Sequence, residues 1–434
     1  MTDKKTFVPK LRFPEFQNDG DWLKSKLIGL SNKPLSNGVF NDPKKVGTGF
    51  KLINVSDMYI ETTIDEGRLS LLELPPSDFH ANQVLFGDIF FTRSSLVASG
   101  IAASNIYLGS SSDVTFDGHL IRFRPDTSKV VPQFAHYLFK AAPIRAQLIA
   151  RGKTATMTTI GQADVAGVTL FNPTKPEQQK IAECLSSLDE LIAAQARKVD
   201  ALKTHKKGLM QQLFPREGET QPRLRFPEFQ NAGEWEVKAL GQIFPITSSK
   251  RVHEADWTPT GVPFYRAREI VALNKRQPIQ PLFISEELYA AHGEQTGEIR
   301  DGHLLVTGVG SIGVPYLVRA GDRFYFKDGN IIWLKNDGNV MSGEFLHRLY
   351  ETDFVQKQLN AMADVGTVAT YTIDNAKRTL AAFPKDKDEQ KRIALFLSSL
   401  DAQVTAEVQK LAALKTHKKA LMQQLFPFPE AVEA

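Results

Sequence analysis

Apolar residues recur with alternating four- and three-residue spacing in two long stretches of the chain, residues 177–213 and 389–425. This is the 3.5-residue repeat of a coiled coil, in which one stripe of side chains faces a partner helix. The stripe of the first stretch consists of Ile181, Leu185, Leu188, Ile192, Val199, Leu202, Leu209 and Leu213. The stripe of the second consists of Ile393, Leu397, Leu400, Val404, Leu411, Leu414, Leu421 and Leu425. Both stretches are predicted to be long helices, and we call these stripes the helix seams.

Each helix seam is interrupted by two polar residues, Gln195 and Lys206 in the first and Glu407 and Lys418 in the second. One helix cannot bury such a seam alone, so the simplest arrangement packs the two helices of one chain against each other as an antiparallel coiled coil. With a rise of about 1.5 Å per residue each helix would be about 55 Å long, which suits a spacer. Ordinary surface helices and an intermolecular helix dimer remain alternatives.

The two helices belong to an internal repeat with a period of about 212 residues, the offset between Glu177 and Glu389. The segment Leu11–Asn18 returns unchanged as Leu224–Asn231, and a tryptophan follows each copy. Each half of the chain therefore begins with the same segment and ends with the same kind of helix. The join at 214–222 has the Pro, Gly and charge content of a linker, and a proline follows the second helix as a stop signal.

Between these repeated ends, each half is predicted to be a mixed α/β globule of short strands. Glycine or Asp-Gly turns precede apolar strands, and one amphipathic helical pattern follows in each half. The matching strand signals are at 87–93 and 302–308, at 116–123 and 327–334, and at 152–160 and 366–373. The helical patterns are at 131–150 and 343–360.

The composition indicates a globular protein of more than one domain, with 434 residues of which 42% are hydrophobic. No stretch is apolar enough for a membrane span and the N-terminus lacks a signal-peptide core, so we expect a cytoplasmic protein. The single cysteine, Cys184, excludes an internal disulfide and a cysteine-based zinc cluster, and is best interpreted as an apolar filler. A net charge of +4 is compatible with nucleic acid as a partner but does not establish one.

The sequence gives little support for catalysis. Gly308–Gly313 matches GxGxxG, but the proline-containing stretch 314–318 follows where a dinucleotide site needs a helix. There is no P-loop, the histidines lack metal-binding spacing, and His205 and His417 are expected on a solvated helical face. Glu177 and Glu389 are interpreted as helix-start residues that favour the helix dipole rather than as metal ligands. No catalytic residue and no metal site is therefore predicted.

What remains is a set of polar and basic residues in the divergent loops, at matching places in the two halves. Arg and Lys bind phosphates and read guanine edges, while Asn and Ser can read other bases. The candidates in the first half are Lys51, Asn54, Arg93, Ser94, Ser95, Arg151 and Lys153. Those in the second half are Tyr265, Arg266, Arg268, Lys275, Arg276, Thr307, Ser311 and Tyr371. For each single residue, simple surface solvation is an equal alternative.

Several motifs together resemble the specificity subunit of type I restriction-modification systems. Glu-Gln-x-x-Ile opens each long helix, Leu-Ser-Ser-Leu-Asp follows, and Lys-Lys-x-Leu-Met-Gln-Gln-Leu-Phe closes it. The strand and loop at 87–94 (Gly-Asp-Ile-Phe-Phe-Thr-Arg-Ser) and the loop Gly-Ser-Ile-Gly at 310–313 also resemble this family. The likeness covers nearly the whole chain in the family's order of domains. One departure is His303, which stands where the first half has Asp88.

The resemblance implies two target-recognition domains related by a pseudo-two-fold axis and separated by the helix pair. In these terms the expected domains are 1–176 and 223–388, the spacer helices 177–213 and 389–426, the linker 214–222 and the tail 427–434. It also implies a subunit without its own active site or cofactor, which reads a bipartite, asymmetric site in double-stranded DNA. Two methyltransferase subunits would dock on the helices and motor-nuclease subunits would join them, so S-adenosylmethionine, ATP and Mg are expected on those partners.

Two further expectations follow from the repeat and the helix length. DNA half-sites on one face are about 34 Å apart per turn, so helices of about 55 Å suit half-sites separated by one to one and a half turns. Because the loop sequences differ between the halves, the two half-sites should differ too. The alternatives are a coiled-coil scaffold that binds proteins rather than DNA, and a nuclease that cuts DNA alone.

Overall fold

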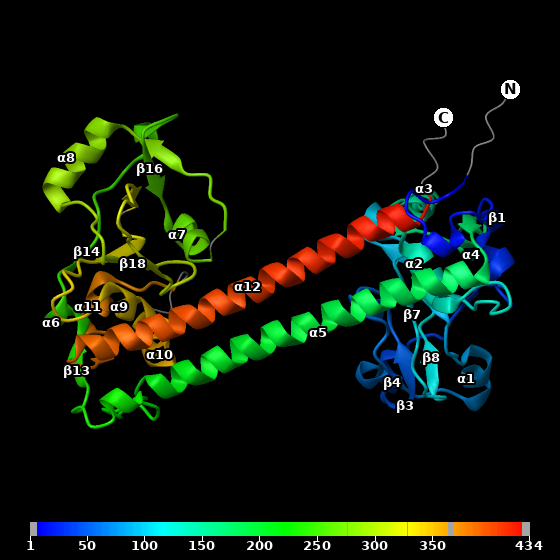
Figure 1. Ribbon diagram of the computed structural model, residues 1–434, viewed down its shortest axis with the longest axis horizontal. Coiled ribbons are helices and arrows are strands. Elements are labelled where there is room, and N and C mark those ends of the chain that lie inside the picture. The colour runs from blue at the N-terminus through cyan, green and yellow to red at the C-terminus, as the bar shows by residue number, and fades with distance from the viewer. Residues whose placement is uncertain (1–6, 276, 328, 363–368, 428–434) are drawn as a thin grey trace. The chain divides into compact units, whose positions relative to one another are not determined.

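The structure is a computed structural model that describes residues 7–275, 277–327, 329–362 and 369–427. Its chain divides into two compact units, which we describe separately: unit 1 (Met1–Arg197 and Val408–Ala434) and unit 2 (Lys198–Glu407). Both predicted long helices are present (Figure 1), as α5 (Lys175–Leu213) and α12 (Lys387–Leu425). Each unit therefore contains part of both helices.

Unit 1 is built from small, mostly antiparallel sheets. The strand orders are β2-β9-β5-β7, β4-β3-β8, β10-β11-β6 and β1-β12, and β3 and β8 form a parallel pair. The strands are β1 (Leu23–Lys26), β2 (Ser36–Asn37), β3 (Val46–Ile53), β4 (Ser70–Leu72), β5 (Ile89–Thr92), β6 (Ser94–Ser95), β7 (Ser104–Ile106), β8 (Val114–Phe116), β9 (Leu120–Phe123), β10 (Lys153–Thr154), β11 (Thr158–Thr159) and β12 (Thr169–Asn172). The short helices are α1 (Pro76–Asn82), α2 (Pro132–Lys140), α3 (Ala142–Ala150) and α4 (Gln162–Ala166).

Unit 2 repeats the two main sheets of unit 1. The orders are β14-β21-β18-β19, β15-β17-β16-β20 and β13-β22, and β16 pairs with β20 in parallel as β3 pairs with β8. The strands are β13 (Glu236–Ala239), β14 (Ile246–Thr247), β15 (Trp257–Thr258), β16 (Val262–Tyr265), β17 (Leu282–Ile284), β18 (Leu304–Thr307), β19 (Pro315–Leu317), β20 (Tyr325–Phe326), β21 (Ile331–Leu334) and β22 (Leu380–Phe383). The helices are α6 (Leu240–Ile243), α7 (Ala267–Asn274), α8 (Glu286–Thr296), α9 (Gly343–Tyr350), α10 (Asp353–Met362) and α11 (Ile373–Arg378).

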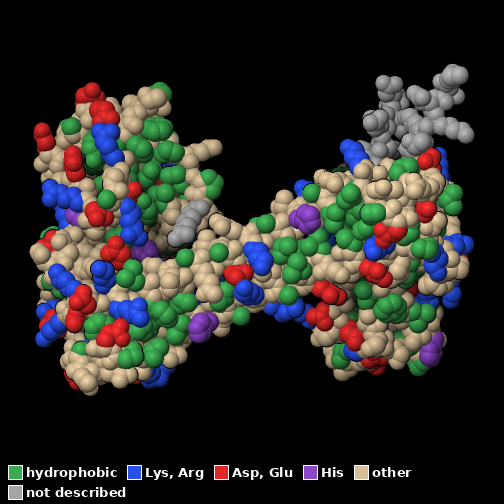
Figure 2. All heavy atoms as spheres, viewed as in Figure 1, with side chains coloured by type: hydrophobic (Ala, Val, Ile, Leu, Met, Phe, Trp, Pro, Cys, Tyr) green, Lys and Arg blue, Asp and Glu red, His purple; other side chains and the backbone are tan. Residues whose placement is uncertain are grey.

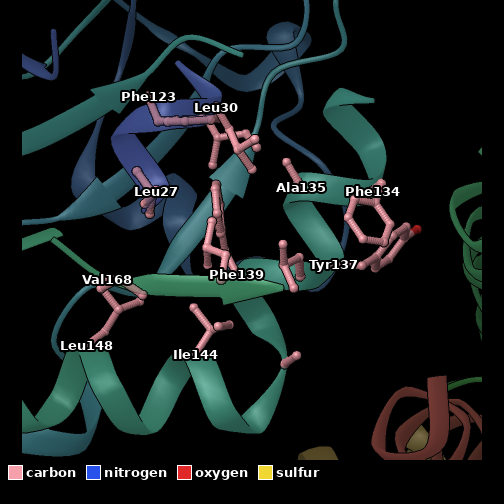
Figure 3. Close-up of a cluster of buried hydrophobic side chains, with 14 of the residues drawn as sticks. Leu27, Leu30, Phe123, Phe134, Ala135, Tyr137, Phe139, Ile144, Leu148 and Val168 are labelled. Carbon is pink, nitrogen blue, oxygen red and sulfur yellow. The ribbon is translucent and has the colours of Figure 1, made fainter. Parts of the chain in front are cut away.

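All four residues of each of the central strands β5, β9, β18 and β21 are buried, and most of them are apolar. A strand buried on both faces has no polar side to alternate with, so it shows no period-two pattern. In unit 1 one face of the sheet packs on α2 and α3. Figure 3 shows the resulting core, in which Phe123 from β9 and Phe139 from α2 lie together, with ring centroids 5.1 Å apart.

The helical patterns predicted at 131–150 and 343–360 each form two helices rather than one. In unit 1, Pro143 stands at the second position of α3, where its missing N–H costs nothing, whereas a continuous helix would clash there. In unit 2 the Thr352 hydroxyl donates to the Leu349 carbonyl oxygen (2.6 Å) at the end of α9. The Thr352 hydroxyl oxygen in turn accepts from the Val355 amide (3.4 Å), which caps the start of α10.

Within each unit the two long helices pack along their seams and run antiparallel. Every seam residue is buried or partly buried. The polar interruptions are paired: Lys206 contacts Asp401 in unit 2, and Lys418 contacts Asp189 in unit 1. These two ion pairs are equivalent under the repeat. In unit 2 a third pair joins Lys198 to Glu407. As the residue numbers rise along α5, those of the partners on α12 fall, which shows that the two helices run antiparallel in this unit.

The repeated first segment of each half is held to a long helix by a buried ion pair. In unit 1 the Arg12 guanidinium donates twice to the Glu177 carboxylate (2.8 and 2.7 Å), and Trp22 Nε1 donates to the same group (3.3 Å). We call this arrangement the Arg–Glu–Trp clasp. The expectation for Glu177 considered only the helix dipole and therefore missed its main role. The hydrogen bonds that Arg12 donates to Glu177 outweigh the effect of burial and raise the pKa of Arg12.

Unit 2 contains the same clasp, formed by Arg225, Glu389 and Trp235, with closely similar distances of 2.7, 2.7 and 3.3 Å. The glutamine of each Glu-Gln pair is buried as well. Gln178 donates to the Lys129 and Pro173 carbonyl oxygens, and Gln390 donates to those of Val340 and Pro384. The Glu-Gln motif is therefore the joint between globule and helix in both units.

His303 lies just before β18, as Asp88 lies just before β5, but the two side chains have different hydrogen-bond partners. Asp88 accepts two hydrogen bonds from Arg124 (2.7 and 2.6 Å) before β5. His303 Nδ1 lies near the Arg300 amide (3.1 Å) and Trp333 Nε1 (3.0 Å) before β18. Since both of those groups can only donate, the histidine accepts through Nδ1 in its neutral form.

We expect this histidine to make unit 2 sensitive to acid. Burial lowers the pKa of His303 from 6.5 to about 4, so between these values the unfolded chain binds a proton that the folded chain does not. Stability is then constant above the unfolded pKa and falls as the pH drops toward 4, by up to about 1.4 kcal/mol per pH unit. Urea unfolding at about pH 7 and about pH 4.5 measures the fall. His303→Gln keeps an acceptor without titrating, and an equal fall in that variant would refute the assignment.

Among the described residues, no helix is both long and apolar enough to span a membrane.

Candidate nucleic-acid interface

The two units present different side chains from the same backbone frame at the ends of their central strands. After β5 the Arg93 amide donates to the His119 carbonyl oxygen (3.0 Å), and after β18 the Gly308 amide donates to that of Asn330 (2.9 Å). The backbone connection is the same in both units. The arginine and histidine of unit 1 are replaced by a glycine and an asparagine in unit 2.

A second shared frame lies where the parallel strand pair ends. After β3 the Asn54 amide donates to Asp57 Oδ2 (2.7 Å), and after β16 the Arg266 amide donates to Glu269 Oε2 (3.0 Å). Each carboxylate thus closes the turn in the same way. The residue carried by the turn is an asparagine in unit 1 and an arginine in unit 2, both half-buried.

In unit 1 the orientation of the Asn54 side chain is fixed by its neighbours. Its Nδ2 donates to the Leu52 carbonyl oxygen (3.3 Å) and Ser70 Oγ (2.8 Å), so its Oδ1 accepts from Asn41 Nδ2 (3.1 Å). The buried Asn41 Oδ1 then has no hydrogen-bond partner among the described residues.

Four of the predicted residues of unit 1 meet in the small sheet β10-β11-β6. Ser94 and Ser95 form β6, Lys153 begins β10, and Arg93 directly precedes β6 with an exposed side chain. The adjoining loop carries exposed apolar residues, since Leu96 is 83% and Val97 60% exposed. A cationic and apolar surface of this kind suits phosphates and thymine methyl groups.

The remaining predicted residues of unit 1 lie elsewhere. Lys51 is half-buried, donates to Ser111 Oγ (2.6 Å) and lies 3.4 Å from Asp113. Arg151 donates to the Gly167 carbonyl oxygen (3.2 Å) at the end of α4. Both side chains are therefore already engaged within the unit, whereas the Arg93 side chain makes no hydrogen bond or ion pair among the residues that the structure describes.

In unit 2 the predicted arginines gather at one carboxylate. Arg266 and Arg268 both donate to Glu269, at 2.9 to 3.1 Å and 2.6 Å. Burial alone would raise the pKa of Glu269, but these hydrogen bonds outweigh it and lower the pKa. Tyr265 stacks on Phe324 with ring centroids 4.5 Å apart, and burial raises its pKa. This cluster places two cations at the end of β16.

Thr307 and Tyr371 are fully buried and support the loop from inside. Thr307 Oγ1 donates to the Ser311 carbonyl oxygen and accepts from the Val314 amide (3.0 Å), while the Tyr371 hydroxyl pairs with Thr379 Oγ1 (2.7 Å). Ser311 itself is exposed, and so is Lys275 at the end of α7. Arg276 lies outside the described residues.

Sequence reasoning missed a hollow of about 500 Å³ in unit 2, which we call the unit 2 hollow. It contains the predicted Arg266, and its other lining residues are Arg251, Val252, His253, Glu254, Trp257, Phe264, Lys327, Gly329 and Asn330. Three separate loops contribute to it, so no single motif could reveal it. A lone tryptophan such as Trp257 gives the same sequence signal as an ordinary core residue.

Charges of both signs are interspersed over the visible face of each unit (Figure 2). On this face, contacts with a polyanion would therefore come from individual cations rather than from one broad basic surface. Within the described ranges, no three His, Cys, Asp or Glu residues converge in a way that could hold a metal ion.

Comparison with known proteins shows which of them this chain is similar to. No family model matches the chain. A curated relative in Haemophilus influenzae, named as a type I restriction enzyme specificity subunit, is 28% identical over 166 residues, which are 38% of this chain and 40% of the relative. The curated relatives are matched over only 40 to 60% of their own length.

Solved structures extend the likeness of fold to nearly the whole chain. The type I restriction-modification S subunit from M. genitalium superposes with a TM-score of 0.55 and 16% identity, over 98% of this chain and 100% of that one. A chain solved in work on assembly and conformational transition of the type I system gives 0.58 and 16%, over 94% and 97%. The chain therefore has the fold of type I specificity subunits, and the resemblance seen in the sequence is confirmed.

Proposed function

We propose that this chain, whose relatives are type I restriction enzyme specificity subunits, is the non-catalytic DNA-recognition subunit of such a complex. Unit 1 and unit 2 each read one half of a bipartite, asymmetric site in double-stranded DNA. The recognition domains are residues 1–176 and 223–388, and the residues between and after them form the linker, the two spacer helices and the tail.

One observation carries this proposal: the two units present different side chains from one backbone frame. Asn54 and Arg93 in unit 1 correspond to Arg266 and Gly308 in unit 2, each pair held by equivalent main-chain hydrogen bonds. A protein that bound two copies of one ligand would need like residues at like places. Unlike residues on a shared frame suit two unlike DNA half-sites.

The seam contacts within each unit support a spacer role for α5 and α12. The equivalent pairs Lys206–Asp401 and Lys418–Asp189 join α5 to α12 within each unit, which supports an antiparallel pairing of the two helices. We propose that this pair sets the distance between the recognition domains and offers two equivalent surfaces to two methyltransferase subunits. Motor-nuclease subunits complete the complex, with S-adenosylmethionine, ATP and Mg bound by the partners.

DNA binding by the complex of this chain with its methyltransferase subunit is expected to depend steeply on salt. If loop cations from both units contact six or more phosphates, affinity should fall by about 10³-fold or more between about 50 and 200 mM salt, because condensed counterions are released on binding. Equilibrium binding to a labelled duplex measures this. The purified chain alone should leave the duplex uncut with Mg present. Salt-insensitive binding, or none, would favour a protein-binding scaffold instead.

A further inference from the structure

The loops that follow β5 and β18 are closed by the same hydrogen bonds in the two units. In unit 1 the Thr92 amide donates to the Ala103 carbonyl oxygen (2.9 Å), and the Ala103 amide donates to Thr92 Oγ1 (3.0 Å). In unit 2, Thr307 and Val314 make the same two bonds (3.1 and 3.0 Å). The two loops are therefore equivalent, and their lengths can be compared directly.

The loop of unit 1, residues 93–102, is four residues longer than that of unit 2, residues 308–313. The later parts of the loops match, since the carbonyl oxygens of Gly100 and Ser311 each accept a hydrogen bond from the anchoring threonine hydroxyl. The additional residues of unit 1 therefore precede Gly100. This longer part contains the adjacent leucine and valine at 96–97, which we call the apolar tip.

The apolar tip is held by hydrogen bonds on both of its sides. Before it, Ser95 belongs to β6, and its Oγ accepts from the Val97 amide (3.3 Å). After it, the Arg145 guanidinium of α3 donates to three carbonyl oxygens of the loop. They belong to Ser99 (3.1 Å), Ile101 (2.7 Å) and Ala102. A loop that is already fixed in this way loses little conformational entropy when it binds a ligand.

The side chains of the apolar tip are among the most exposed apolar groups of unit 1. Met157, which is 39% exposed, directly precedes Thr158, the partner of Ser95 in the sheet. Because β6 and β11 run antiparallel, Met157 leaves the small sheet at the same end as Leu96. A single exposed leucine is ordinary, but several exposed apolar side chains at the end of a fixed loop mark an interaction surface.

The small sheet from which the tip extends also carries cations. The exposed Arg93 directly precedes β6, and Lys153 of β10 is 80% exposed, with its Nζ 3.8 Å from Asp164. A partner must therefore offer anionic groups and an apolar group close together. Duplex DNA does so, because phosphates border the major groove and the methyl group of thymine is the apolar feature of the base edges within it.

We propose that Leu96, the more exposed residue of the apolar tip, contacts the methyl group of a thymine in the half-site that unit 1 reads. This inference rests on the proposed function. It assigns the contact to unit 1 alone, because the shorter loop 308–313 of unit 2 lacks the additional residues. Leu96 is thus a specificity-determining residue that reads a base without a hydrogen bond.

The test uses deoxyuridine, which differs from thymidine only in lacking the methyl group. Each thymine of the recognised duplex is replaced in turn, and affinity is measured for the complex of this chain with its methyltransferase subunit. The complexes contain the wild-type chain, Leu96→Ala or Leu23→Ala. Leu23, an exposed leucine of β1 outside the loop, supplies the matched control. Thermal unfolding and gel filtration verify that each variant is folded and binds the methyltransferase subunit.

One deoxyuridine replacement should weaken binding about 4-fold in the wild-type and Leu23→Ala complexes, which corresponds to the loss of one buried methyl group. It should lie in the half-site that changes when residues 24–170 are exchanged. In Leu96→Ala the same replacement should have no effect, because the contact is already missing.

Four results would overturn this inference alone. They are a half-site of unit 1 without thymine, the absence of any deoxyuridine effect in the wild-type complex, an effect that persists in Leu96→Ala, and a Leu96-dependent effect in the other half-site. Loss of methyltransferase binding in Leu96→Ala, with the deoxyuridine effect unchanged, is one form of the third result and would assign the tip to a protein contact. A wild-type complex that binds no duplex overturns the proposed function and the inference together.

Discussion

Exchanging residues 24–170 for the corresponding segment of another such chain is expected to change one half of the recognised DNA site and leave the other half unchanged. The segment includes the loop residues Asn54 and Arg93, but it excludes Arg12, Trp22 and Glu177 of the clasp. The new domain would therefore be held to α5 by the same clasp. Because each mismatched base pair costs roughly 1–3 kcal/mol, three or more changed positions should abolish modification of the old site.

Mapping of methylated adenines in a host that co-expresses the exchanged chain with the methyltransferase subunit measures this change. The matched exchange is 237–381, since Val237 pairs with Ala382 at the sheet edge as Lys24 pairs with Phe171. It should alter the opposite half-site. A map in which one exchange altered both half-sites, or neither, would contradict the assignment of one half-site to each unit.

Glu177→Gln is expected to destabilise unit 1 by about 3–5 kcal/mol, because it leaves the buried guanidinium of Arg12 without its counter-charge. The two side chains are 6% and 1% exposed and share two short hydrogen bonds, so water cannot replace the lost carboxylate. The first segment would then lose its anchor on α5. Chemical denaturation, with hydrogen exchange to assign the effect to a unit, measures the loss.

The repeat supplies the controls for this prediction. Glu389→Gln breaks the equivalent clasp and should destabilise unit 2 by a similar amount. Glu15→Gln removes an ion pair with Lys180 in which both side chains are 46% exposed, and it should change stability little. A Glu177→Gln protein as stable as the Glu15→Gln protein would show that the clasp does not hold the domain to the helix.

The long helices could be predicted from sequence because their signal is local and repeated. A seam such as that of Ile181 and Leu185 recurs over many turns, and its copy 212 residues later follows the same phase. The polar interruptions at Lys206 and Lys418 could not be explained in advance. Their partners, Asp401 and Asp189, lie on the other helix, and sequence spacing gives no information about that distance.

The candidate interface was less predictable because the role of a polar residue depends on its burial. Thr307 and Tyr371 look like surface candidates in the sequence, yet both are buried and hold a loop through hydrogen bonds. Trp257 gives the opposite case, since it looks like a core residue and yet its buried Nε1 has no hydrogen-bond partner among the described residues. In each case the deciding fact is a contact between segments far apart in the chain.

The most direct test of the central claim is a map of methylated adenines in a host that co-expresses the wild-type chain with its methyltransferase subunit. The account predicts one recognised site made of two unlike half-sites at a fixed separation, because two unlike units are joined by one helix pair. A palindromic site, a single uninterrupted site, or methylation that does not depend on this chain would contradict it.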